Sequence, residues 1–275
     1  MQHTLPLIGA AMRLNELAEF ADWLAADQRD LEIQDPAYPG YLDQDWRAEA
    51  QHGKALLDDK GYTGRLGIHA AFEGIELSTF DKKLRAVIQE RYLESLDFGA
   101  VVGATHMVIH SPLMAFGTAF ANFANPLILN MVIENVHLAL EKVLPVAQSM
   151  GCALVIECIA DKNPGPLTTL VKSFNSDFVR LSVDTGHAAL MEAQGGTSPQ
   201  DWLAHVGDLL GHVHLQDLDY HADRHWALGD GNLNWFAFFR ALKNITSQPR
   251  LVLEMNDKAD IMRSMAWLER HQLGR

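Results

Sequence analysis

The sequence predicts an α/β protein with a single domain, residues 1–275, folded as a closed (β/α)8 TIM barrel. Eight short, largely apolar runs alternate with longer stretches of helical periodicity, which is the pattern of a parallel barrel. A chain of 275 residues has the usual size for that fold. The alternative is an open, doubly wound sheet, but no G-x-G-x-x-G motif follows the first apolar run, which weakens that interpretation.

Each of the eight runs is expected to be a strand because it is short and apolar, as buried parallel strands are. The third and seventh runs fit this criterion least well. The expected strands are residues 5–11, 31–34, 66–70, 106–110, 153–158, 179–184, 211–215 and 251–255.

Helices are expected between these strands. Within residues 15–26, Leu17, Phe20 and Leu24 recur at the spacing of one helix face. The segment 126–150 contains Pro145, which predicts a kink or a restart at that point. The other expected helices are residues 81–98, 166–174, 199–206, 233–242 and 257–271.

Composition and charge exclude several classes of protein. The chain is 48% hydrophobic, which indicates a globular protein, and 22 basic against 35 acidic residues give a net charge of −13. Such a charge opposes broad binding to nucleic acid. No apolar run is long enough to cross a membrane, and the N-terminus lacks the pattern of a secretory signal. With only two cysteines, the expected location is the cytoplasm.

Polar side chains follow the apolar runs at the C-terminal ends of the last six strands, which is where barrel enzymes place their sites. These residues, from the third strand to the eighth, are His69, His110, Glu157, Asp184, His214 and Glu254. Two expected loops add His187, in DTGH, and the pair Asp223 and His225, in ADRH.

This mixture of imidazole and carboxylate groups predicts a site for divalent metal ions such as Zn²⁺, Mn²⁺, Mg²⁺, Co²⁺ or Fe²⁺. The residues from the fifth to the eighth strands should converge on one ion, because those strands are successive. His69 and His110 could hold a second ion with Glu157 as the bridge. His187, Asp223 and His225 could hold a third, so we expect one to three ions per chain.

The stretches that carry these residues resemble those of the xylose isomerase-like TIM-barrel superfamily, from about residue 5 to 270. They are GIHAAF, VIHSP, VIECIADKNP, SVDTGHAAL, HVHLQDLDYHADRHWALGDGNLNW and LVLEMND. The superfamily contains sugar and sugar-phosphate isomerases and epimerases, and also the family 2 AP endonucleases. The resemblance implies one metal ion at Glu157, Asp184, His214 and Glu254, as in the epimerases, or three zinc ions on all nine residues, as in the endonucleases.

The first functional hypothesis is a metal-dependent isomerase or epimerase acting on a sugar or sugar phosphate. Glu157 and Glu254 would be the catalytic pair, one removing a proton next to the carbonyl and the other returning it through an enediolate. The alternative is that both glutamates are ligands only. His187 and Trp226 would contact the substrate, although helix packing is an equal interpretation for Trp226.

The second hypothesis is a multi-zinc phosphodiesterase of the AP endonuclease type. The full set of nine ligands supports it. Two departures oppose it, because the endonuclease-like stretch here has Gln216 for Asn and Leu218 for Ser. The loop DPAYPGYLDQD is also acidic where a DNA-cleaving relative needs arginine. We therefore expect a small carbohydrate rather than nucleic acid or a membrane as the partner; the sequence does not indicate the oligomeric state.

Two further groups of residues have alternative interpretations. Phe116, Phe120 and Phe123 follow His110 and could form an apolar lid, with burial against the barrel as the equal alternative. On the same expected strands, His106 lies four positions before His110 and His212 lies two positions before His214. Each pair should therefore share one face of its strand. We expect His106 and His212 to be interior packing or groups that support the ligands.

Overall fold

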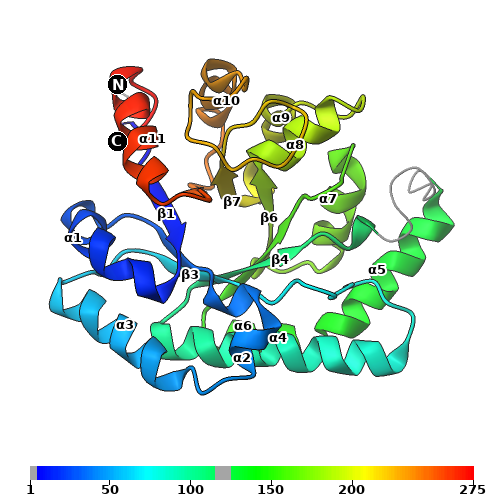
Figure 1. The fold of residues 1–275 in the computed structure, drawn as a ribbon. Helices are drawn as coiled ribbons and strands as arrows, with labels where there is room; N and C mark the ends of the chain where they lie inside the picture. Colours follow the sequence, from blue (N-terminus) through cyan, green and yellow to red (C-terminus); the bar gives the residue numbers. More distant parts are fainter. Residues whose placement is uncertain (1–4, 115–124) are drawn as a thin grey trace.

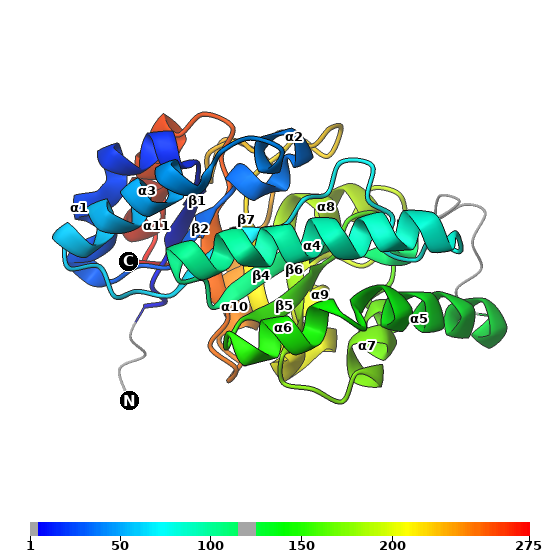
Figure 2. The ribbon, with the colours of Figure 1, turned by 90° about the horizontal axis from the view of Figure 1, so that it is seen from below.

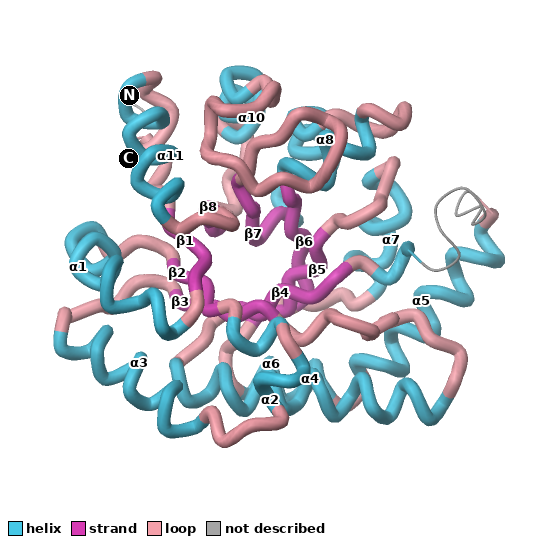
Figure 3. The backbone as a smooth tube through the Cα atoms, viewed as in Figure 1, coloured by secondary structure: helices cyan, strands magenta, loops and turns pink. Residues whose placement is uncertain are grey.

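The computed structural model describes residues 5–114 and 125–275, and these form a closed, all-parallel barrel whose strands follow chain order, β1 to β8. Figures 1 and 3 show the strands as a central ring with the helices outside it. The barrel predicted from the sequence is therefore confirmed. The strands are β1 Gly9–Met12, β2 Leu31–Ile33, β3 Leu66–His69, β4 His106–His110, β5 Ala153–Glu157, β6 Val179–Asp184, β7 Leu210–Leu215 and β8 Arg250–Leu253.

The ring closes where β1 pairs with both β2 and β8, with Gly9 opposite Val252 and Ala11 opposite Glu32. The first strand is shorter than the expected residues 5–11. The reason is that the amide of Ile8 donates to the carbonyl of Arg275 at 3.0 Å, so this part of the chain pairs with the C-terminus instead of a neighbouring strand.

Eleven α-helices surround the barrel within the described residues, and Figure 2 shows α4 lying across one side of it. They are α1 Leu17–Asp27, α2 Pro39–Leu42, α3 Arg47–Asp59, α4 Lys82–Val102, α5 Pro126–Leu140, α6 Val143–Ser149, α7 Pro164–Ser173, α8 Thr185–Glu192, α9 Pro199–Val206, α10 Trp235–Leu242 and α11 Ala259–Arg270. Four short 3-10 helices complete the structure at Leu14–Glu16, Asp35–Ala37, Pro112–Met114 and Gly207–Leu209.

The helix predictions were right in position but incomplete. The segment 126–150 divides before Pro145, which falls in the first turn of α6, where a proline interrupts no helical hydrogen bond. Helix α3 was not predicted, because only Ala50, Gly53 and Leu57 of its residues are buried and the apolar stripe is thin. Helix α8 was also not predicted. Phe116, Phe120 and Phe123 lie outside the described residues.

Within the described residues, no helix is long and apolar enough to cross a membrane. The largest fully buried side chains, such as Trp202, Tyr92 and Phe98, belong to the surrounding helices. The interior of the barrel is different, because polar side chains are buried there. Glu32 on β2 lies 3.2 Å from His212 on β7, although two other strands separate them around the ring, so the contact crosses the interior.

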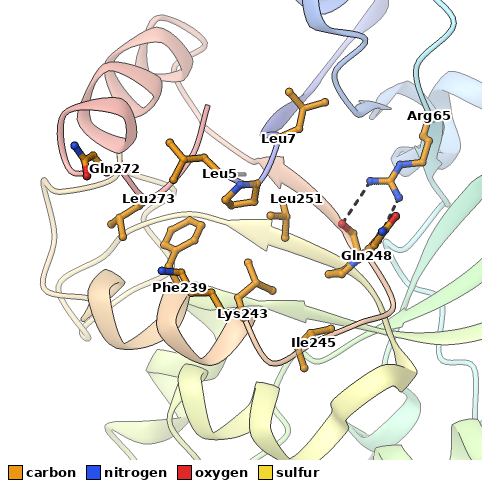
Figure 4. A pocket seen from close by; sticks show the side chains of 13 residues that line it. Leu5, Leu7, Arg65, Phe239, Lys243, Ile245, Gln248, Leu251, Gln272 and Leu273 are labelled. Atoms are coloured by element: carbon orange, nitrogen blue, oxygen red, sulfur yellow. Dashed lines mark hydrogen bonds between the residues drawn. The ribbon is translucent and has the colours of Figure 1, made fainter. Parts of the chain in front are cut away.

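A cavity of about 490 Å³ lies at the opposite end of the barrel from the C-terminal strand ends, and Figure 4 shows its lining. Leu251 and Phe239 contribute apolar surface, and Arg65 donates to the carbonyl of Gln248 at 2.8 Å. Among its described lining residues there is neither a histidine nor a carboxylate. It is larger than the cavity at the C-terminal mouth, but its described lining has no imidazole or carboxylate to bind a metal ion.

Gly67 on β3 makes room for the ring of His106 on β4. A Cβ built on Gly67 would lie 1.9 Å from Cε1 of His106, which is fully buried and has no space to withdraw. Gly67→Ala should therefore lower the free energy of unfolding by about 1–3 kcal/mol and reduce the Tm by several degrees.

The matched control is Gly40→Ala, since nothing lies within 4 Å of a Cβ at that exposed position. Thermal unfolding followed by circular dichroism compares the two variants. Equal Tm values for Gly67→Ala and Gly40→Ala would contradict the packing described here.

Candidate metal centre and active site

All nine residues predicted as metal ligands lie at the C-terminal end of the barrel. The structure arranges them in three groups, and within each group the candidate ligand atoms all lie within 4.8 Å of one another. The groups are Glu157, Asp184, His214 and Glu254; His69, His110 and Glu157; and His187, Asp223 and His225. This is the partition expected from the sequence, and the role of these residues as ligands remains a prediction.

The central group is built on β5 to β8, with Glu254 directly after the last strand. Nδ1 of His214 lies 2.9 Å from Oε1 of Glu157 and 3.5 Å from Oε2 of Glu254. Asp184 caps helix α8, since its Oδ1 accepts from the amide of His187 at 2.7 Å. His187 is therefore in the first turn of a helix, and its expected position in a loop was wrong.

The second carboxylate oxygen of Asp184 gives a test of whether the central group suits a metal ion. Asp184 is fully buried, and its Oδ2 has no hydrogen-bond partner among the described residues. A buried carboxylate oxygen without a partner is costly. A cation held with Glu157, His214 and Glu254 would remove that cost, so these donors fit a divalent ion.

The two flanking groups extend the site to either side. Nε2 of His69 and Nε2 of His110 lie 3.6 and 3.8 Å from the same oxygen, Oε2 of Glu157. In the third group, Oδ2 of Asp223 lies 3.3 Å from Nε2 of His187 and 3.1 Å from Nε2 of His225. Glu157 thus belongs to two groups, because one oxygen faces His214 and the other faces the histidine pair.

Four histidines have one ring nitrogen fixed and the other aimed into the site. His69 donates its Nδ1–H to the carbonyl of Ala70 at 2.9 Å. His187 donates in the same way to Cys158 at 3.2 Å, and His225 to Glu254 at 3.0 Å. A carbonyl can only accept, so Nδ1 keeps its proton in each ring and Nε2 is the nitrogen that would release its proton to bind a metal ion. In His214 the order is reversed, since Nε2 donates to Oε1 of Glu32 at 3.0 Å and leaves Nδ1 for the site. This is how proteins orient metal-binding imidazoles.

The carboxylates of the site keep two histidines protonated, and a metal ion would displace those protons. Burial lowers the pKa of His214, but Glu254, Glu32 and Glu157 outweigh it and hold that pKa well above its usual value. Burial likewise opposes the protonation of His225, yet its hydrogen bond to Asp223 raises the pKa to about 9. Imidazole must lose its proton to bind a metal, so binding should release protons.

Burial has the dominant effect on the pKa of two other residues of the site, Asp184 and His110. Burial raises the pKa of Asp184 to about 6, although His187 opposes this shift. Burial also lowers the pKa of His110 to about 3, with the neighbouring charge of His69 acting in the same direction. His110 is consequently neutral at pH 7, which is the form that can bind a metal ion.

The three groups open into a cavity of about 410 Å³. Sequence reasoning missed several of its lining residues, including Arg13, Gln34 and Lys258. Gln34 ended an expected strand and so carried the same positional signal as the ligands; its Nε2 donates to Oε1 of Glu254 at 2.5 Å. Arg13 and Lys258 lie in loops and carried no such signal. Trp226 is absent from the described residues that line this cavity, so its predicted contact with substrate has no support in this geometry.

Comparison with known proteins gives the same architecture. An uncharacterized protein of Methanocaldococcus jannaschii, MJ1311, is 20% identical over 216 residues, which cover 76% of this chain and 71% of that protein. The structure of the TTHB071 protein from Thermus thermophilus, soaked with ZnCl₂, is 26% identical with a TM-score of 0.72, and covers 98% of this chain and 99% of that one.

A D-tagatose 3-epimerase-like protein has a TM-score of 0.76 at 19% identity, with 97% of each chain covered. At this identity the likeness concerns the fold. The sequence pattern of the family described as xylose isomerase-like TIM barrel matches residues 29–271. The match spans most of the barrel and all nine candidate ligands, and the chain belongs to that family.

Proposed function

We propose that this protein is a divalent-metal-dependent isomerase or epimerase that acts on a sugar or sugar phosphate. The observation that carries the proposal is that Glu157 and Glu254 both line the mouth cavity, with one oxygen of each within 2.9 and 3.5 Å of Nδ1 of His214. The cavity volume of about 410 Å³ is within the range of small-molecule sites. Polar and charged side chains dominate its lining, as recognition of hydroxyl groups requires.

The central group would hold the ion through Glu157, Asp184, His214 and Glu254. A divalent ion held there would supply Lewis-acid chemistry, polarising a substrate carbonyl and stabilising negative charge on its oxygen. One glutamate removes a proton from the carbon next to the carbonyl, and the other delivers a proton to the resulting enediolate. Gln34 fixes one oxygen of Glu254 and leaves Oε2 of that residue facing the site. His187 stands beside Glu157 and would contact a substrate oxygen.

Structures of similar fold support this class of reaction. One is named as a D-tagatose 3-epimerase-like protein, and another was determined as a D-psicose 3-epimerase in the presence of D-fructose. Moving a hydrogen at a carbon next to a carbonyl is the chemistry for which two opposed carboxylates are suited. Ketoses are therefore the first substrates to test.

Two cations in the same cavity favour a substrate with an anionic group. Arg13 and Lys258 both line it, and the guanidinium of Arg13 stacks on the ring of Tyr38 at 4.6 Å. Glu16 offsets part of this charge, since its carboxylate accepts from the backbone amide of Arg13 at 2.8 Å. Nζ of Lys258 donates to the carbonyl of Met255 at 2.8 Å, and an ammonium group has two further donors. Arginine and lysine side chains both bind phosphate.

A second candidate is the multi-zinc phosphodiesterase. The observation in its favour is the three complete groups, because a single-ion isomerase has no need of His187, Asp223 and His225 as ligands. The net charge of −13 opposes it, since duplex DNA would be repelled. We expect no cleavage of an abasic duplex and little binding to DNA even at low salt.

The affinity for Mn²⁺ should rise with pH from below about pH 6 upwards. In the ion-free protein Asp184 has a pKa raised to about 6, and the surrounding carboxylates hold the pKa of His214 well above its usual value, so an ion bound by the central group competes with protons on both residues. Each displaced proton should change the affinity by up to about tenfold per pH unit. Calorimetric titration in two buffers of different ionisation enthalpy measures both the affinity and the protons released. The exposed-site variant His52→Asn should behave as the wild type does, and an affinity independent of pH would contradict the protonation described above.

Incubation with D-fructose, D-tagatose, D-psicose and their phosphates in D₂O should place deuterium on the carbon next to the carbonyl. Glu157→Gln and Glu254→Gln should each slow this exchange by about 10²–10⁴-fold, because each removes one acid–base group. The exposed Glu73→Gln is the matched control and should exchange at the wild-type rate. Nuclear magnetic resonance follows the label.

The outcome that contradicts this function is the absence of exchange with every ketose, together with cleavage of an abasic duplex at low enzyme concentration. That pair of results would establish the phosphodiesterase instead.

Arg13→Gln and Lys258→Gln should each raise the KM for a ketose phosphate by about tenfold, since each removes a charge-assisted hydrogen bond. The KM for the unphosphorylated ketose should change little. Steady-state kinetics with the two substrates makes the comparison within one variant. Equal effects on both substrates would show that these cations do not recognise a phosphate.

A further inference from the structure

Beneath the mouth of the barrel, Glu32, His106 and His212 form a second cluster that the proposed reaction does not use. All three side chains are fully buried. They come from β2, β4 and β7, which are not neighbours in the ring, so the side chains meet across the interior. From the sequence, the two histidines were expected to be interior packing or support for the ligands, and no role was expected for Glu32.

The three side chains approach one another without forming hydrogen bonds. Oε2 of Glu32 lies 3.2 Å from Nε2 of His212 and 3.8 Å from Nε2 of His106. None of these three atoms has an aligned hydrogen-bond partner among the described residues. Buried polar atoms are nearly always paired, and leaving a carboxylate oxygen and two imidazole nitrogens unpaired is strongly unfavourable.

Surrounding contacts hold these side chains in this orientation. The second oxygen of Glu32 accepts from Nε2 of His214 at 3.0 Å, and Nδ1 of His212 lies 2.8 Å from Oγ of Ser182. Gly67 provides the space that the ring of His106 occupies. Oε2 of Glu32 and the Nε2 atoms of the two histidines lie close enough together to share one ion. Nδ1 of His106 also has no hydrogen-bond partner among the described residues, so the ring is held by packing alone.

We propose that Glu32, His106 and His212 form a buried site for a divalent transition-metal ion, separate from the groups at the mouth. Two imidazole nitrogens and one carboxylate oxygen are a common protein ligand set for zinc. Ligand atoms around a tetrahedral zinc ion with bonds of about 2.0–2.2 Å lie about 3.3–3.6 Å apart. The two measured separations of 3.2 and 3.8 Å are close to that spacing.

Such an ion would also support the mouth. It would neutralise Oε2 of Glu32, whose Oε1 fixes His214 with Nδ1 towards the central group. The proposal does not depend on the reaction catalysed at the mouth, because it concerns different ligand atoms. Since the site is fully enclosed, the ion should enter during folding and exchange slowly afterwards.

The retained zinc content of the protein tests this site. Protein produced with zinc and then treated with a chelator should lose the ions at the mouth and retain about one zinc per chain. His106→Asn and His212→Asn should each lose this retained zinc, whereas the surface variant His52→Asn should keep it. Glu157→Gln alters the mouth and should also keep it, which separates this proposal from the function proposed above.

Crystals of the chelator-treated wild type provide a measurement that does not depend on the folding of any variant. Diffraction at the zinc absorption edge should show an anomalous peak within about 2.0–2.2 Å of Oε2 of Glu32 and the two Nε2 atoms. The proposal is overturned if no anomalous peak lies at this position, or if the density there is a water molecule without anomalous signal. Equal zinc retention in His106→Asn and His52→Asn overturns it as well.

Discussion

His214 lies fully buried between two carboxylates, and the arrangement of the barrel mouth depends on this contact. Glu32 holds its Nε2 at 3.0 Å and Glu157 faces its Nδ1 at 2.9 Å. Buried carboxylates this close together are stable only when they share protons or a cation. In the ion-free protein His214 takes a proton for this purpose, because the carboxylates outweigh burial, which alone would lower its pKa. A metal ion would take over the same role.

The barrel makes this concentration of charge possible. Hydrogen-bonded parallel strands and the apolar layer between strands and helices provide the stability, so the strand ends are free to carry unfavourable groups. Several of these groups are further fixed by backbone atoms, as in His187, whose Nδ1 donates to the carbonyl of Cys158 and whose amide is bound by Asp184. The polar mouth is therefore already organised before a substrate or ion arrives, which limits the cost of reorganisation during a reaction.

Much of this could be predicted from the sequence because a parallel barrel converts order along the chain into position around a ring. A residue such as Glu157, at the end of an apolar run, necessarily lies at the mouth, between the strands that carry His110 and Asp184. Glu32 could not be identified in the same way, because it stands within a three-residue strand and its partner His212 is on the far side of the ring. Arg13 and Lys258 reach the cavity through loop geometry, which the periodicity of the sequence does not encode. Helix α3 was missed because most of its residues are exposed, so its few buried residues form only a weak apolar pattern.

Diffraction from crystals loaded with Mn²⁺ shows whether the four-residue group on β5 to β8 binds the functional metal ion. An anomalous peak at the manganese edge should lie between Glu157, Asp184, His214 and Glu254. The peak should disappear in Asp184→Asn crystals, because the residue loses its negative charge, while the barrel remains folded. A manganese peak elsewhere, with the central position empty, would show that this group is not the metal site.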